Sequence, residues 1–242
     1  MASFDTLHAD AHKRGNIRKA VRTVGYLGRR SEVDPPESMF TNADGEVDIV
    51  DLKEAGFSPI GMVTVDGYNF AREDSNSEVQ SQGFLSPTRE DLESSNRTVT
   101  FTVQEVMKKG IKEFLNGTRY DDAVFAAGDS EVVLRTPEFP QHEEWCLVVV
   151  AIDGPSGDEH LDAKVLPTIK VQTVGGEQFG GDSERNREVT ARVYVDDELG
   201  VPEIDIIGGH AFARTAEDLG YGTEENGDGG TEGNGDGGAE GN

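Results

Sequence analysis

The sequence contains one cysteine, and its 242 residues include 22 lysines and arginines against 47 acidic residues. One cysteine excludes an intramolecular disulfide, and we expect Cys146, which precedes the apolar stretch LVVV, to be a buried residue on a strand. No apolar run approaches the roughly 18 residues that a membrane-spanning helix needs. The net charge of −25 gives a surface that repels nucleic-acid phosphates and anionic lipids. The composition argues against a disulfide-stabilised secreted domain, a membrane protein and a protein that grips DNA.

Catalytic signatures are also missing. The sequence has no phosphate-binding glycine loop, no G-x-S-x-G, no H-E-x-x-H and no paired C-x-x-C. His8 and His12 have helical spacing, but no third metal ligand lies near them in the sequence. The acidic stretch 196–205 lacks the glycine and the spacing of a calcium-binding EF-hand loop. We therefore expect no enzymatic activity, no cofactor and no metal.

Basic residues gather at the start of the chain. Residues 1–30 carry seven lysines and arginines and two aspartates, a net charge of +5, which leaves −30 for the remaining 212 residues. The basic residues are compatible with three kinds of segment: a solvated helix face, an arm that docks on an acidic neighbour, or a targeting or nucleic-acid-binding segment. The candidate arm residues are Arg14, Arg18, Lys19, Arg22, Arg29 and Arg30.

Glycine and acidic residues dominate the other end. The octapeptide NGDGGTEG at 226–233 is followed directly by NGDGGAEG at 234–241. Neither copy has the apolar residues that would offset the entropy of ordering, and the period of eight differs from the nine of calcium-binding β-roll repeats. We therefore predict a flexible acidic tail over residues 216–242, a basic arm over residues 1–30 and a folded body over residues 31–215.

The body is predicted to be mainly β. Alternation of apolar and polar residues indicates half-buried strands, whereas the continuous apolar run CLVVVAI indicates a strand buried on both faces. Pro167 predicts an edge strand or a bulge, and the last three strands suggest an antiparallel meander. The predicted strands are residues 60–67, 98–105, 131–136, 144–153, 163–174 and 187–197.

One helix is predicted in the body, directly after the strand that ends near Thr102. Thr102 and Glu105 have capping-box spacing, and Gly117 is placed to end the helix, which is expected near 105–116. An apolar stripe should pack this helix on the sheet. The residues of that stripe are Met107, Ile111, Phe114 and Leu115.

Residues 57–105, continuing through the helix to LNG at 115–117, resemble the major tail proteins of long-tailed bacteriophages that infect actinobacteria. The resemblance lies in the order of several elements: IGMVTVDG at 60–67, a polar acidic-serine loop, GFLSPTRED at 83–91 and RTVTFTVQE at 97–105. It covers about 60 residues directly, and the succession of strands at 144–197 also fits that family.

The resemblance implies a mainly β (α+β) fold, a tail-tube-type β-sandwich or split barrel with one flanking α-helix and flexible termini. It implies six-membered rings stacked into a hollow tube through which viral DNA passes without specific binding. It also implies that terminal arms reach between rings, which makes the basic arm residues named above the candidate inter-ring arm. The implied partners are other copies of the chain, a tape measure protein, a tail terminator and baseplate proteins. The implied location is the virion, after synthesis in the host cytoplasm, and no membrane is involved. As candidates for lumen-facing acids we take Asp162, Glu177, Glu188 and Asp196.

Two alternatives remain open from the sequence. A β-sandwich binding module that works as a monomer would also show strands without a catalytic motif. An enzyme of a halophile would explain the acidity, although Lys108, Lys109 and Lys112 are unlike the lysine-poor surfaces of such proteins.

Overall fold

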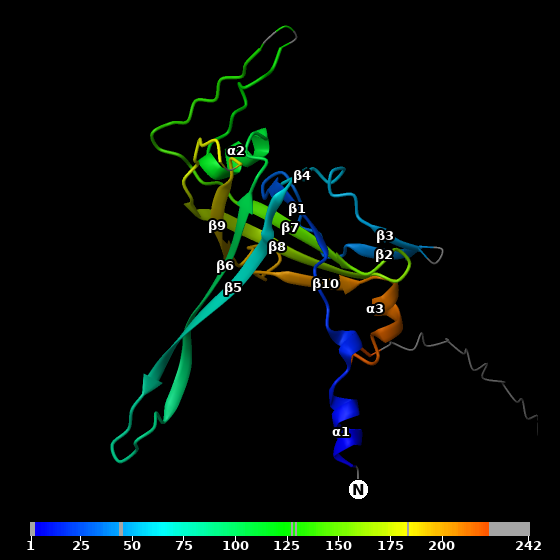
Figure 1. Cartoon of the computed structure of the whole chain (residues 1–242). Helices are drawn as coiled ribbons and strands as arrows, with labels where there is room; N and C mark the ends of the chain where they lie inside the picture. The colour runs from blue at the N-terminus through cyan, green and yellow to red at the C-terminus, as the bar shows by residue number, and fades with distance from the viewer. Residues whose placement is uncertain (1–2, 44–45, 127, 129, 183, 223–242) are drawn as a thin grey trace, which may run out of the picture.

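The mainly β prediction is confirmed. A computed structural model describes residues 3–43, 46–126, 128, 130–182 and 184–222. Within them an eight-stranded antiparallel sheet has the order β4–β1–β7–β8–β9–β6–β5, with β10 also paired to β8, and β2 and β3 form a separate hairpin (Figure 1). The elements are α1 (Phe4–Ala11), β1 (Arg22–Arg29), β2 (Phe40–Ala43), β3 (Glu46–Ile49), β4 (Ser58–Pro59), β5 (Val63–Val79), β6 (Arg89–Val103), α2 (Lys109–Asn116), β7 (Trp145–Asp153), β8 (His160–Val174), β9 (Arg187–Tyr194), β10 (Ile204–Gly208) and α3 (His210–Thr215).

Strand β7 lies between two core clusters because it is apolar on both faces. Alternate residues such as Leu147 and Val149 belong to one core cluster, with Phe101 and Phe114, and the residues between them belong to a second. That second cluster contains Cys146 and Val148 and is covered by the segment that includes β2 and β3. The strand predicted at 144–153 is therefore buried on both sides, as its continuous apolar run indicated.

Strand β8 is the point at which the sheet divides. One of its edges pairs with β7, whereas its other edge pairs with β10 over Leu161–Val165 and with β9 over Thr168–Val174. Pro167 lies in an irregularity of the β7–β8 ladder, which confirms the bulge that the proline predicted.

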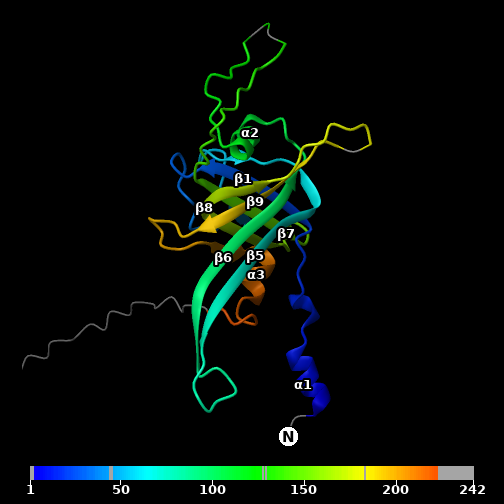
Figure 2. The ribbon, with the colours of Figure 1, turned by 90° about the vertical axis from the view of Figure 1, so that its left-hand side faces the viewer.

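The two ends of the sheet approach each other without joining. Only residues 60–62 connect β4 at one end to β5 at the other, and the amide of Ile60 donates to the carbonyl of Gly25 over 2.9 Å. Among the described strands no ladder joins β1 to β5, so the curled sheet is an open barrel. The first core cluster fills its inside, and α2 covers one end (Figure 2).

The helix differs in detail from the prediction. It begins at Lys109 without a side-chain cap, since the Glu105 carboxylate accepts a hydrogen bond from the Met62 amide instead of capping the helix. Gly117 ends it in the left-handed conformation, as predicted. Ile111, Phe114 and Leu115 are buried, but Met107 precedes the helix and is 75% exposed, so it is not part of the packed stripe.

Further segments differ from the sequence prediction, beginning with the hairpin, where strands β5 and β6 extend beyond the strands predicted at 60–67 and 98–105. Residues 131–136 are exposed and form no strand, because no described strand pairs with them. Residues 22–29, predicted as part of the basic arm, form β1 and pair with β7 along their whole length. The segment that precedes the body is therefore residues 3–21, and the amides of Lys19 and Val21 bond its end to β7. Residues 223–242, and with them both octapeptides, lie outside the described residues.

Candidate assembly surfaces

The most unusual feature is a long β-hairpin that leaves the body (Figures 1 and 2). Strands β5 and β6 have 17 and 15 residues, and all residues of 71–94 except Ser81 are exposed. Phe84 and Leu85 lie at its tip with most of their surface in solvent. A two-stranded ribbon without a packed face is only marginally stable in water. The hairpin therefore presents a surface that a partner would stabilise.

The projecting part of this hairpin is acidic. Residues 71–94 contain six acidic residues and two arginines. Both arginines are paired inside the hairpin, Arg72 with Asp74 and Arg89 with Asp91, each over 2.7 Å. The hydrogen bond from Arg72 lowers the pKa of Asp74. The remaining carboxylates give the hairpin a surface that attracts cations.

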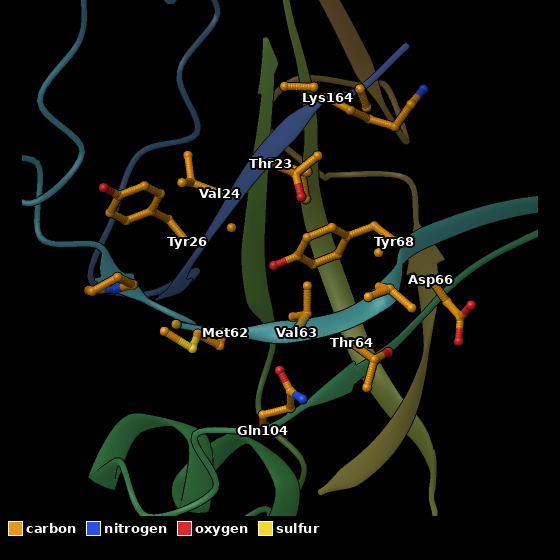
Figure 3. Close-up of a pocket in the computed structure, with 18 of the residues that line it drawn as sticks. Thr23, Val24, Tyr26, Met62, Val63, Thr64, Asp66, Tyr68, Gln104 and Lys164 are labelled. Atoms are coloured by element: carbon orange, nitrogen blue, oxygen red, sulfur yellow. The ribbon is translucent and has the colours of Figure 1, made fainter. Parts of the chain in front are cut away.

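A second surface lies at the gap between β1 and β5, where a cavity of about 910 Å³ separates the two strands (Figure 3). Its rim carries exposed apolar residues, namely Val24, Met62 and Val65. Tyr68 reaches into the gap from β5, close enough that a Cβ atom at position 25 would overlap its hydroxyl. Burial raises the pKa of Tyr68. Within the described residues its hydroxyl has no hydrogen-bond partner.

The third surface is the polar face of β6 and β9. Val99, Phe101 and their neighbours on β9 point into the core, so the alternate residues of both strands point away from it. There the hydroxyls of Thr100 and Thr190 lie 3.0 Å apart across the ladder. Glu188 lies opposite Thr102 on this face and is exposed. It is the one candidate lumen acid that the fold places there.

The other three candidate acids lie elsewhere. Asp162 lines the cavity between β1 and β5, where burial raises the pKa of its carboxyl. Glu177 is paired with Lys112, Arg185 and Arg187 at distances of 3.7, 2.5 and 3.4 Å, and the hydrogen bond from Arg185 lowers its pKa. The four acids therefore do not share one surface.

Asp196 is part of a buried ion pair. Its side chain is 2% exposed, and one carboxylate oxygen accepts hydrogen bonds from Arg30 Nε and Thr168 Oγ1, both at 2.7 Å. The other oxygen accepts from the amides of Glu198 and Leu199, each at 3.0 Å. The bond to Arg30 contributes most to lowering the pKa of Asp196, which therefore stays charged. This carboxylate fixes the loop after β9 to the end of β1.

The six candidate arm residues divide into two groups. Arg29 contacts Glu113 and Glu143, each over 2.8 Å, and Arg30 binds Asp196, so both belong to the body. Arg18 and Lys19 are exposed in the extending segment, and Arg22 is exposed at the start of β1. Arg14 lies in the short turn of 3₁₀ helix at Arg14–Asn16.

A long loop projects from the end of the molecule that is opposite to the hairpin (Figure 1). It follows α2, and the described residues of 121–142 are exposed apart from Ala123. Several of the exposed side chains are large and apolar. They are Val124, Phe125, Val132, Val133, Leu134 and Phe139.

The described residues contain no group of three or more metal-ligating side chains. His8 and His12 stack with ring centroids 4.3 Å apart, on the arm. Cys146 is fully buried, and burial raises its pKa to about 12, which makes it a poor nucleophile at neutral pH.

None of the described helices is long and apolar enough to span a membrane.

The comparisons with known proteins find likenesses among solved structures, whereas the sequence comparisons find none. No protein-family model matches the chain, and no curated protein sequence matches it. Among solved structures, a chain of the anti-feeding prophage baseplate, determined by cryo-electron microscopy with six-fold symmetry, superposes with a TM-score of 0.41 and 10% sequence identity. The superposition covers 78% of this chain and 93% of that chain. A likeness at this level assigns neither a fold nor a function.

Proposed function

We propose that this protein is a structural subunit of a bacteriophage tail, which assembles with copies of itself into stacked rings that form the tail tube. The observation that carries the proposal is the projecting hairpin. Residues 71–94 have almost no contact with the rest of the chain and expose Phe84, Leu85 and Leu92. Such a hairpin becomes stable when a neighbouring copy covers it.

The positions of the projecting segments suit stacking. The hairpin and the loop at 121–142 extend from opposite ends of the body (Figure 1). Contacts between two different surfaces of identical subunits build rings or open-ended assemblies. A tube needs two kinds of contact, because subunits must meet side by side within a ring and end to end between rings.

The resemblance to actinobacteriophage major tail proteins supports the same function. The residues that carry it, 57–117, are those that form β5, the hairpin, β6 and α2. Residues such as Thr100, Thr190 and Glu188 give the uncovered face of β6 and β9 a polar surface, which we assign to the lumen. A negative net charge suits a channel through which DNA slides without binding.

The expected partners follow from this function. Besides copies of itself, the subunit would contact a tape measure protein, a tail terminator and baseplate proteins, and viral DNA would pass through the lumen. The expected location is the virion. The number of subunits in a ring, which we expect to be six, is part of this proposal.

Concentration-dependent assembly tests the proposal. Analytical ultracentrifugation and negative-stain microscopy of the concentrated protein should show rings or tubes. A variant in which residues 76–93 are replaced by Asn-Gly joins the paired residues Ser75 and Ser94 by a two-residue turn. It should keep its thermal unfolding temperature within about 3 °C and remain a monomer, because the removed residues pack on nothing in the body.

A wild-type protein that stays a stable monomer of 26.1 kDa at high concentration would instead favour the monomeric binding module. Unfolding at low salt would favour the halophile enzyme. The matched control for the hairpin variant replaces Phe139, in the loop at the opposite end, with serine. It should still form rings, since in this proposal that loop contacts the next ring.

A further inference from the structure

The hairpin contains a pair of carboxylates that repel each other. In the β5–β6 ladder Glu78 lies directly opposite Glu90, so both side chains leave the same face of the ribbon. Like charges in opposed positions destabilise an antiparallel pair. Asn76 donates a hydrogen bond to Glu90, but it brings no positive charge. Leu92, 60% exposed, lies opposite Asn76 on this face. The face combines negative charge with an exposed apolar side chain.

The N-terminal arm has the complementary composition. Residues 12–20 contain four basic residues and no acidic one, a net charge of +4. Arg18 and Lys19 are exposed, and Ile17 beside them is 74% exposed. Lys13 makes one long contact with Asp218, at 3.5 Å between exposed side chains. This stretch therefore combines positive charge with an exposed apolar residue.

The two segments also lie in suitable positions. The arm and the hairpin extend from the same end of the body and are separate from each other in both views (Figures 1 and 2). Two copies placed side by side would bring the arm of one beside the hairpin of the next. Val21 is anchored to the body, since its amide donates to the carbonyl of Ile152 over 3.1 Å, so the arm starts from a fixed position.

We propose that residues 12–20 of one copy dock along the β5–β6 hairpin of a second copy. Arg18 and Lys19 lie against Glu78 and Glu90, and Ile17 packs on the exposed Leu92. This contact rests on the proposed assembly into rings, in which it would hold neighbouring subunits together. It relieves the repulsion within the hairpin and covers apolar surface on both partners.

Charge reversal in two chains tests the contact. One variant carries Arg18→Glu and Lys19→Glu, and the other carries Glu78→Lys and Glu90→Lys. Each alone should need about tenfold more protein to assemble, because two attractive contacts become repulsive. An equimolar mixture should assemble like the wild type, since each arm then meets a hairpin of opposite charge on its neighbour.

The matched control is Glu37→Lys with Glu54→Lys, which makes the same change of net charge as the hairpin variant, at exposed positions away from the hairpin. It should assemble like the wild type, and thermal unfolding checks that every variant is folded. A wild type that never assembles would overturn both this contact and the proposed function. Charge-reversed variants that assemble as readily as the wild type would overturn the contact alone.

One further outcome identifies an arm that docks on the hairpin of its own chain. In that case the mixture would not recover, whereas one chain with all four substitutions would assemble normally. That result would overturn the contact between copies.

Discussion

Single carboxylates have very different roles in this acidic chain. Asp196 and Asp197 are adjacent and chemically identical, yet Asp196 is buried against Arg30 and Thr168 whereas Asp197 is exposed. The partner that makes the difference lies 166 residues earlier in the chain. Sequence patterning describes neighbours along the chain, so the prediction of Asp196 as a lumen residue rested on its charge and on its position at the end of a predicted strand.

Replacement of Asp196 by alanine should lower the free energy of unfolding by about 3 kcal/mol, because it leaves the guanidinium of Arg30 in a largely buried site without its main partner. Urea denaturation followed by tryptophan fluorescence measures the change. Asp197→Ala is the control and should stay within about 0.5 kcal/mol of the wild type. Equal effects at the two positions would contradict the role assigned to the buried pair.

At the scale of elements, periodicity predicted most of the sheet. The alternation around Val99 and Phe101 and the double-sided burial of β7 both appear in the structure, because these patterns reflect burial of whole faces. The strand expected at 131–136 does not form, since a strand also needs a neighbour with a free edge. Strand β1 was missed because its arginines placed it with the basic arm.

Helix α2 provides a quantitative test at this scale. Phe114 is 1% exposed and packs edge-on against Trp145, with 5.4 Å between ring centroids. Phe114→Ala should therefore destabilise the protein by about 4 kcal/mol, from lost burial and the cavity that remains. Met107→Ala, in the turn before the helix, should change stability by less than about 0.5 kcal/mol. Equilibrium denaturation of both variants checks the assignment, and a large effect at Met107 would contradict it.

At the scale of the whole molecule, several surfaces are suited to contacts with other subunits. Three parts of the surface are unusually exposed or open for a domain that works alone. They are the ribbon of residues 71–94, the gap between β1 and β5 and the loop at 121–142. They lie on different sides of the body (Figures 1 and 2). A subunit with neighbours on several sides would cover them, which agrees with the proposed tube.

Cysteine labelling tests the assignment of the lumen. Cys146 is buried with a raised pKa and should not react, so a single introduced thiol reports its own position. Glu188→Cys lies on the uncovered face of β9, and Glu54→Cys lies on the exposed segment that covers the opposite side of the sheet. A bulky maleimide should label both in the monomer, but only the second in assembled tubes. Rapid labelling of Glu188→Cys in tubes would contradict the assignment.

The sequence by itself determined the mainly β character of the body, the faces of its central strands and the end of α2 at Gly117. These properties depend on residue type and local spacing. The tertiary structure alone decided which carboxylates are neutralised, which strand edges remain open and how far the hairpin extends. Those properties depend on residues that are distant in the chain, and strand pairing brings them together only in the folded state.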